Sequence, residues 1–208
     1  MVNEVIYLNK KDWTGNSKSI FSTLAASNHS EQERVERDYY ATSPLAVELL
    51  LEKENFSPIV WENAVGGGHI ADVLIKHGYK VKCSDIVDRG YPNTHILNFL
   101  QYQPMKELDL DIISNPPYSE AQSFVEKSIQ CVATGHKVAM FLKLQFLEGK
   151  ARRSLFNQHP PKIVYVSSGR LLCAPNGDFE KTKSSAVAYA WFVWEKGYRG
   201  KPMIDWIN

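Results

Sequence analysis

The chain has 208 residues, of which 44% are hydrophobic and 23% are charged. These values are ordinary for a globular protein, and the length suits one domain that buries a core without disulfide staples. A formal net charge of +1 excludes a protein that coats nucleic acid through bulk positive charge, but it permits a local basic face. We therefore expect residues 1–208 to form a single domain.

The cysteines and the N-terminal residues indicate the cellular compartment in which we expect the protein to act. Cys83, Cys131 and Cys173 lie far apart and are odd in number, which favours neither a metal site nor a disulfide framework. We expect reduced core cysteines and no metal. Residues 1–16 lack a basic stretch followed by an apolar one, and no apolar run reaches membrane-spanning length. These features predict a soluble, cytoplasmic protein without a membrane partner.

The N-terminal part begins with weak periodicity. Residues 1–27 carry several turn formers, and we expect them to be partly mobile. Ser30 and Glu33 have the spacing of a capping box, which predicts a short helix. Ser43-Pro44 is typical of a helix N-cap and first helical position, so we expect a helix over about residues 44–54.

Strands and helices then alternate. The expected strands are residues 59–61, 80–86, 111–113, 137–144, 162–167 and 186–194, and the expected helices between them are residues 69–77, 120–132 and 147–158. This alternation predicts an α/β fold, a doubly wound and mostly parallel sheet with helices on both faces. The last expected strand follows another strand with no helix between them, so we expect it to run antiparallel at or near one edge.

A glycine-rich turn, Gly66-Gly67-Gly68, separates the strand at residues 59–61 from its helix. In doubly wound sheets this turn lies at the carboxyl ends of the strands, where a ligand can approach a backbone without side chains. Asp85 ends the next strand, 19 residues after Gly66, a spacing that suits an acid accepting hydrogen bonds from ribose hydroxyls. The pair predicts a nucleotide-like cofactor, although glycines alone could serve only to make a tight turn.

Glu62, just before the turn, discriminates between two such cofactors. A carboxylate there would repel the pyrophosphate of a dinucleotide. It would instead attract S-adenosylmethionine (SAM), which carries an ammonium and a sulfonium group. Glu62 therefore favours SAM, the alternative being a solvated acid at the end of a strand.

The most informative string is Asn115-Pro116-Pro117-Tyr118, directly after the strand at residues 111–113. Two prolines cannot continue a sheet ladder, and each restricts the residue before it, so they make a rigid loop beside the expected crevice. The Asn115 side chain and the flanking backbone carbonyl offer two acceptors at fixed angles, which suit an amino group with two protons to donate. Tyr118 would supply a flat surface for stacking a base. The alternative is a loop that merely ends the strand, with a buried tyrosine.

This string, on this strand and after the Glu62-x-Ala64-x-Gly66-x-Gly68 turn, resembles the amino-methyltransferases of the class I SAM-dependent fold. The chain is most similar to small, single-domain, phage-type adenine-specific DNA methyltransferases, over about residues 38–194. The resemblance implies a Rossmann-like sheet of seven strands, SAM as the cofactor, and methyl transfer to the N6 amino group of adenine in DNA.

The resemblance also implies a role for each matching residue. The segment around Tyr40 contacts the methionine part of SAM, the glycine turn holds the cofactor, and Asp85 binds the ribose. The adenine ring of SAM lies beside Asn98-Phe99. The implied cofactor site comprises Tyr40, Thr42, Glu62, Ala64, Gly66, Gly68, Asp85, Ile86, Asn98 and Phe99. The implied catalytic loop comprises Asn115, Pro116, Pro117 and Tyr118.

Three features depart from the family pattern. Asn63 stands where a proline is common, and Asn98 stands where an aspartate is common, which makes the role of Asn98 less secure. In this circular order of motifs a target-recognition domain usually follows the catalytic one, and the sequence ends at Asn208 without such a domain.

A basic segment, residues 143–183, is the expected nucleic-acid contact. It holds eight Lys or Arg and three Asp or Glu, which gives +5 and leaves −4 for the rest of the chain. This asymmetry favours one face that meets phosphates, the alternative being a solvated lysine-rich surface. The stretch 171–184 reads as a loop between the last two strands and could replace the missing recognition domain. The expected phosphate contacts are Arg152, Arg153, Arg170, Lys181 and Lys183.

Two kinds of rival function remain open. The same chemistry could act on adenine in RNA or on a glutamine amide of a protein, because those enzymes use the same string. A nicotinamide-dependent oxidoreductase would use the glycine turn, but it gives Asn115-Pro116-Pro117-Tyr118 no purpose. The interpretation we favour is a DNA adenine methyltransferase that flips its target base into a pocket over this loop.

Overall fold

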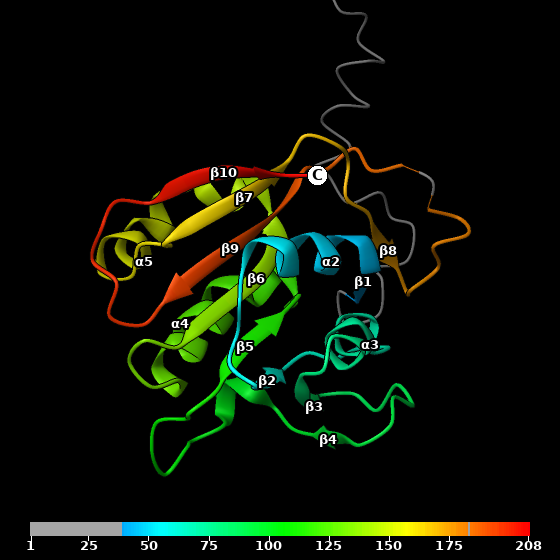
Figure 1. The fold of residues 1–208 in the computed structure, drawn as a ribbon, viewed down its shortest axis with the longest axis horizontal. Coiled ribbons are helices and arrows are strands. Elements are labelled where there is room, and N and C mark those ends of the chain that lie inside the picture. Colours follow the sequence, from blue (N-terminus) through cyan, green and yellow to red (C-terminus); the bar gives the residue numbers. More distant parts are fainter. Residues whose placement is uncertain (1–38, 183) are drawn as a thin grey trace, which may run out of the picture. The chain divides into compact units, whose positions relative to one another are not determined.

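The computed structural model describes residues 39–182 and 184–208, so the expected mobile segment 1–27 and the expected helix near Ser30 lie outside the described residues. The main sheet has the strand order β10-β7-β9-β6-β5-β2-β3-β4, and only β9 runs antiparallel to its neighbours (Figure 1). Its strands are β2 (Ile59–Glu62), β3 (Lys80–Asp85), β4 (Thr94–Ile96), β5 (Asp111–Ser114), β6 (Lys137–Lys143), β7 (Ile163–Ser167), β9 (Tyr189–Glu195) and β10 (Met203–Ile207).

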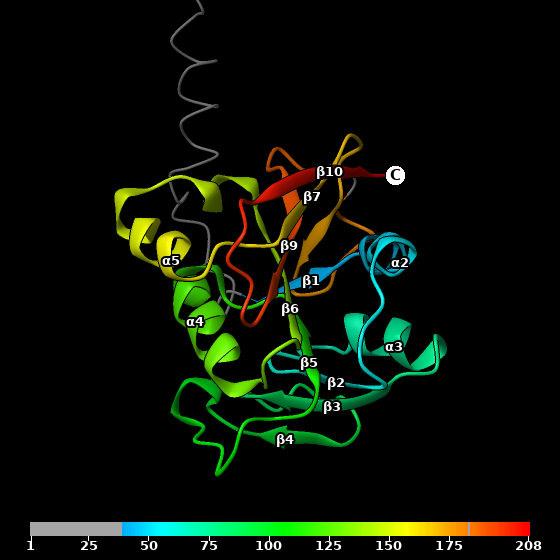
Figure 2. The ribbon, with the colours of Figure 1, turned by 60° about the vertical axis from the view of Figure 1, so that its left-hand side comes forward.

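Helices cover both faces of this sheet. One layer is formed by α2 (Pro44–Lys53) and α3 (His69–Lys76), and the other by α4 (Ala121–Cys131) and α5 (Arg153–Gln158). Figure 2 shows the sheet between these two layers. The predicted doubly wound, mostly parallel α/β fold is therefore confirmed.

The two layers pack on opposite faces of the central strands. On β6, Met140 and Leu142 pack against the α4 and α5 side, whereas Phe141 packs against the α2 and α3 side. The neighbouring strand β9 does the same, with Phe192 on one face and Trp191 on the other. All five side chains are almost wholly buried. Strands that are buried on both faces have continuous apolar sequences, and this is why β6 and β9 could be predicted from the sequence.

The sheet differs from the expected one in strand number and in its last strands. It has eight strands among the described residues rather than seven, because β10 adds a strand beyond β7. The antiparallel direction expected for residues 186–194 is confirmed, but β9 lies between β6 and β7 and is not an edge strand. The helix expected over residues 147–158 starts only at Arg153, because Gly149 has a φ of +108° that an α-helix cannot contain.

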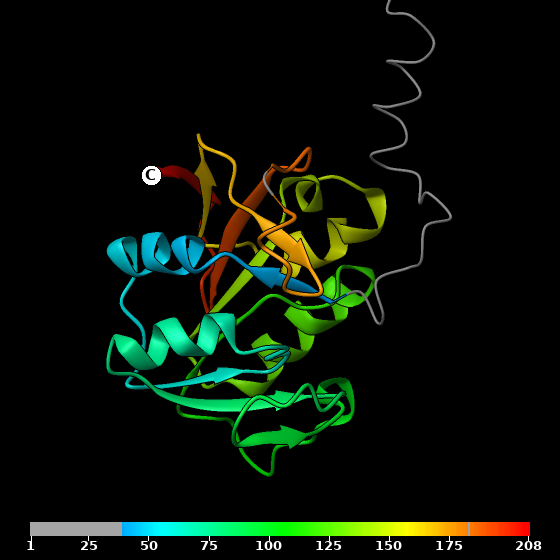
Figure 3. The same ribbon diagram turned by 90° about the vertical axis from the view of Figure 1, so that its right-hand side faces the viewer.

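A separate two-stranded ribbon stands beside the carboxyl edge of the main sheet. It consists of β1 (Tyr40–Thr42) and β8 (Cys173–Pro175), paired antiparallel with Thr42 opposite Cys173. Figure 3 shows the two strands side by side. The stretch 171–184 was expected to be a loop, and the ribbon anchors its first part instead: Leu171, Cys173 and Ala174 are buried.

Candidate active site

The main cleft lies where the order of strands reverses. The chain proceeds from β2 outward to β3 and β4, whereas β5 pairs with the other side of β2 and leads to β6. Ligands of doubly wound sheets bind outside the carboxyl ends of the strands at such a reversal. The cleft there contains about 580 Å³ of empty space, part of it open to solvent. The expected site residues that line it are Tyr40, Ala64, Asp85, Ile86, Asn98, Phe99, Asn115 and Pro117.

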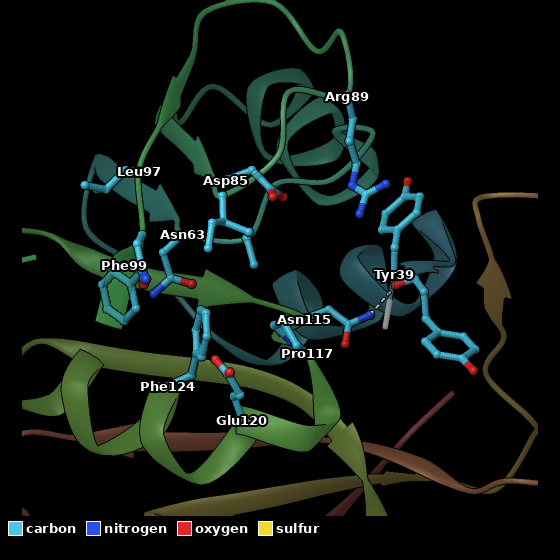
Figure 4. Close-up of a pocket in the computed structure, with 14 residues that line it drawn as sticks. Tyr39, Asn63, Asp85, Arg89, Leu97, Phe99, Asn115, Pro117, Glu120 and Phe124 are labelled. Atoms are coloured by element: carbon cyan, nitrogen blue, oxygen red, sulfur yellow. Dashed lines mark hydrogen bonds between the residues drawn. The ribbon is translucent and has the colours of Figure 1, made fainter. Parts of the chain in front are cut away.

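Figure 4 shows how the cleft is arranged. Phe99 and Phe124 lie at one end, and Tyr39 with Arg89 lies at the other. A smaller hollow adjoins the second end, and the expected residues that line it are Tyr40, Thr42, Glu62, Ala64 and Asn115. Asn115 lines both spaces and so stands at their junction.

Glu62 places an unpaired carboxylate oxygen beside the smaller hollow. Its side chain is 2% exposed, and its Oε2 has no hydrogen-bond partner among the described residues. Burial raises the pKa of Glu62 well above its ordinary value, and nearby Asp85 and Asp72 add to this, while a hydrogen bond from the backbone of Ala71 opposes it. A buried carboxylate without a partner is costly, and a cationic group in the hollow would relieve that cost.

The structure gives a reason for glycine in this turn that differs from the expected approach of a ligand to the backbone. Gly66 and Gly68 have φ angles of +56° and +84°, which favour glycine. A Cβ at Gly66 would lie 2.4 Å from the ring of Tyr39, and a Cβ at Gly68 would lie 1.9 Å from the ring of Tyr91. The protein's own rings therefore cover the turn, and neither glycine lines the cleft or the smaller hollow.

Asp85 fixes the turn from the end of β3. Its Oδ2 accepts a hydrogen bond from the backbone of Gly66 at 2.9 Å, and its Oδ1 accepts one from the backbone of Val87 at 2.9 Å. A carboxylate oxygen can accept two hydrogen bonds, so each oxygen keeps one free position toward the cleft. The carboxylate can thus hold the turn and still accept from a ligand hydroxyl.

The two asparagines that depart from the family pattern both line the cleft. Asn98 Oδ1 accepts a hydrogen bond from the backbone of Leu100 at 3.1 Å and caps the short 3-10 turn that follows β4. An aspartate in this position would keep a second acceptor oxygen, whereas Asn98 has N–H donors left. Asn63 is 2% exposed, and its Oδ1 has no partner among the described residues.

Asn115 is held in one orientation by its nitrogen. Its Nδ2 donates to the backbone oxygen of Tyr40 at 2.7 Å, and the sulfur of Cys173 lies 3.6 Å from the same nitrogen. Because a carbonyl oxygen can only accept, the atom facing Tyr40 must be the amide nitrogen. The Oδ1 atom is left buried with no partner among the described residues. The site thus offers one unused acceptor at the junction of its two spaces.

Tyr118 does not present the open stacking surface that was expected. It lines neither the cleft nor the smaller hollow. Its ring packs against the rings of Tyr40 and Tyr189, with centroids 5.6 and 5.8 Å away, and the ammonium of Lys143 lies 4.8 Å from its centroid. Its hydroxyl contacts Cys173 Sγ at 3.1 Å. The rings of Tyr40 and Tyr189 and the Lys143 ammonium therefore already occupy the surroundings of the Tyr118 ring.

The four expected phosphate contacts that the structure describes, Arg152, Arg153, Arg170 and Lys181, line neither space. The Arg152 guanidinium donates hydrogen bonds to the backbone oxygens of Phe146 and Gln145, at 2.8 and 3.3 Å, and so stabilises the turn that precedes it. Lys181 pairs with Asp178 at 2.7 Å but is 87% exposed. Arg153 and Arg170 are exposed. Lys183 lies outside the described residues.

Sequence reasoning missed several residues of the site. No sequence pattern marks Tyr39. Its hydroxyl nevertheless accepts a hydrogen bond from the backbone N–H of Gly67 at 3.0 Å, and the Arg89 guanidinium lies 4.3 Å from its ring centroid. Phe124 of α4 closes one end of the cleft, and Cys173 of β8 contacts Asn115 of the Asn115–Tyr118 loop. Only the apolar spacing of α4 could have marked one of them, Phe124, as inward-facing.

The chain matches known proteins only at the level of solved structures. No family model matches the chain, and no curated protein matches it. A candidate RNA methyltransferase from Pyrococcus horikoshii is 16% identical with a TM-score of 0.57, over 84% of this chain and 95% of that one. A candidate class I SAM-dependent methyltransferase from Listeria monocytogenes is 11% identical with a TM-score of 0.57, over 90% of this chain and 71% of that one.

A third similar structure is the modification subunit of a candidate type I restriction enzyme from Vibrio vulnificus. It is 11% identical with a TM-score of 0.57, over 91% of this chain and 50% of that one. Within the described residues, no helix is long and apolar enough to cross a membrane, and no group of three or more His, Cys, Asp or Glu could hold a metal ion. Identities this low establish architecture alone: the chain has the Rossmann-like fold of class I SAM-dependent methyltransferases.

Proposed function

We propose that this chain transfers a methyl group from SAM to the N6 amino group of adenine in DNA. The observation that carries the proposal is the state of Asn115. Its amide nitrogen is engaged by Tyr40, and its buried Oδ1 is unpaired where the cleft meets the smaller hollow. An unpaired buried acceptor costs free energy unless a donor completes it, and an exocyclic amino group is such a donor.

The residues present fit SAM along the length of the site. The adenine ring of SAM would lie between Ile86 and Phe99, and the free positions of the Asp85 carboxylate would accept the ribose hydroxyls. The ammonium of the methionine part would pair with Glu62, whose Oε2 has no partner among the described residues. Asn98 then donates to a ring nitrogen of adenine, because its oxygen already caps the turn after β4.

Asn115 acts on the acceptor amine. An aromatic amine is a poor nucleophile because its lone pair is delocalised into the ring. Asn115 Oδ1 and the backbone oxygen of Pro116 accept its two N–H groups, which favours a pyramidal nitrogen with its lone pair directed away from both. Bound SAM supplies an electrophilic methyl group, so that the sulfur–methyl bond breaks as the nitrogen–methyl bond forms. The nitrogen then releases one proton to solvent, and catalysis depends on positioning and electrostatics.

A base in a duplex cannot reach this site unless it leaves the stack. Moving Lys143 away from the ring of Tyr118 would free part of a stacking surface, at a cost of about 1–2 kcal/mol for a partly buried cation–π contact. The displaced ammonium would remain near the phosphates of the flipped nucleotide. Arg153 and Arg170 are exposed, and such cations support nucleic acid rather than a protein amide as the acceptor.

The test uses purified protein, isotope-labelled SAM, and matched duplex DNA, RNA and protein acceptors. Mass spectrometry of the digested DNA should find N6-methyladenine, and calorimetry should find saturable binding of SAM but not of NAD. Label in RNA or protein alone would overturn the DNA assignment and keep the chemistry. Binding of NAD without SAM would overturn the methyltransferase assignment itself.

A further inference from the structure

Cys173 joins the β1–β8 ribbon to the catalytic loop through two polar contacts. Its sulfur lies 3.1 Å from the hydroxyl oxygen of Tyr118 and 3.6 Å from Asn115 Nδ2. The residue is 6% exposed, so water does not compete for these contacts. Cys83 and Cys131 are also buried, but neither forms a side-chain hydrogen bond to a described residue. Packing alone therefore does not distinguish Cys173 from the other two, whereas its partners do.

The two contacts on Asn115 Nδ2 account for both of its protons. One proton points to the backbone oxygen of Tyr40 and the other to the sulfur of Cys173. With one anchor the amide could still rotate about that single hydrogen bond and change the direction of Oδ1. With two anchors, on β1 and β8, the plane of the amide is fixed, and Oδ1 can point in only one direction.

The protonation state of the thiol agrees with this arrangement. Burial raises the pKa of Cys173 to about 11, although its hydrogen bonds with the side chains of Tyr118, Asn115 and Tyr189 oppose the rise. At neutral pH the thiol therefore keeps its proton, which the hydroxyl of Tyr118 can accept, while the sulfur lone pairs accept from Asn115. No buried negative charge arises, and the contacts are stable across the ordinary pH range.

We propose that Cys173 is a positioning residue that aims Asn115 Oδ1 at the acceptor amine, and that it couples β8 to the catalytic loop. The proposal rests on the proposed function of Asn115. It gives β8 a part in catalysis, because a shift of this strand would move the sulfur and release the amide. The experiments below separate a failure of this idea from a failure of the methyltransferase assignment.

The first experiment measures transfer kinetics for Cys173→Ala, Cys173→Ser and the matched control Cys131→Ala. We expect Cys173→Ala to lower kcat about tenfold, equal to 1.4 kcal/mol, with the Kd for SAM unchanged. Cys173→Ser should recover part of the loss, because a hydroxyl can also accept from Asn115. Cys131→Ala removes an equally buried thiol far from the loop, so its kcat should match that of the wild type.

The second experiment needs no methyl transfer. The side-chain amide signal of Asn115 is assigned by NMR from its absence in Asn115→Asp, and it is then followed in the cysteine variants. Cys173→Ala should shift one of the two amide protons and speed its exchange with solvent, whereas Cys131→Ala should change neither. A change in the amide signal without a loss of kcat, or the reverse, would overturn the proposal. If the wild type transfers no methyl group, the proposed function fails, and the amide signal alone decides whether Cys173 orients Asn115.

Discussion

The glycine turn and the Asn115–Tyr118 loop follow neighbouring parallel strands, yet the protein leaves them in opposite states. At the turn, the backbone N–H of Gly67 is satisfied by the hydroxyl of Tyr39, and the rings of Tyr39 and Tyr91 cover the neighbouring glycines. In the loop, Asn115 and Tyr118 are held by contacts from β1 and β8, and one acceptor remains open. We call the turn the cofactor side and the loop the acceptor side, after the roles proposed for them. The first is closed by the protein's own rings, whereas the second keeps one buried acceptor unpaired among the described residues.

Asn115→Ala should break the acceptor side and have the largest effect. We expect it to remove more than nine-tenths of turnover, at least about 1.4 kcal/mol in barrier, while the affinity for SAM stays nearly intact. Single-turnover transfer and calorimetry measure the two quantities. Asn55→Ala, at an exposed position on the loop before β2, serves as the control. A variant that keeps more than about a tenth of wild-type activity would show that Asn115 does not act on the amine.

Gly66→Arg and Asp85→Ala should break the cofactor side. The first forces a side chain into the space of the Tyr39 ring at a positive φ. The second removes the carboxylate that anchors the turn at Gly66 and the following loop at Val87. Each should weaken SAM binding by more than about tenfold, or 1.4 kcal/mol, as measured by calorimetry. Asp88→Ala, at an exposed site in the next loop, should leave the affinity unchanged. Normal SAM binding by Asp85→Ala would remove the ribose assignment.

Glu62→Gln should sharpen the comparison by separating stability from binding. Burial raises the pKa of Glu62, so the free folded protein holds a proton there that the unfolded chain releases at lower pH. Stability should therefore fall as pH rises above the ordinary pKa of glutamic acid, and Glu62→Gln should remove this loss and raise the Tm at neutral pH.

The same variant should bind SAM more weakly, because it cannot pair with an ammonium. Wild-type binding should release a proton and weaken as pH falls, since the cation stabilises the charged carboxylate. Calorimetry in buffers of different ionisation enthalpy counts that proton. Binding without proton release, or equal affinity of Glu62→Gln, would place the ammonium elsewhere.

The smallest effect is expected on the basic surface. Arg153→Ala should lower the slope of log Kd for DNA against log salt by about one unit, because one phosphate contact is lost. Arg152→Ala should leave that slope unchanged and lower the Tm, because its guanidinium holds the carbonyls of Phe146 and Gln145. Equal slopes for both variants and the wild type would make this segment a solvated surface.

The sequence predicted those parts of the molecule that local chemistry determines. Buried strands such as β6, and the Ser43-Pro44 start of α2, carry apolar runs and cap residues that can be read directly. The three-residue strands β1, β4 and β8 are too short to carry a period. The edge strand β10 leaves Ile204 and Trp206 exposed, so its pattern does not follow burial.

Within the site, sequence motifs predicted which residues would lie together, but not which side chains would pack against them or form hydrogen bonds with them. Asp85 and Asn115 line one cleft as their strand ends implied. The contacts of Tyr39 with the turn and of Cys173 with the loop join residues 28 and 58 positions apart, and no local pattern encodes such pairs. A ligand was expected to lie against Gly68, whereas the ring of Tyr91 packs against it.

The position of β9 has a consequence for how the chain is synthesised. β9 pairs with β6 on one side and β7 on the other, although both precede it in the sequence. Until residues 189–195 leave the ribosome, β6 and β7 have no partner on their facing edges, and Phe141 lacks the rings of Tyr189 and Trp191 that cover it. Unpaired apolar edges are prone to aggregate during such a wait. The late strand therefore makes a nascent chain that needs protection until residues 189–195 have been synthesised.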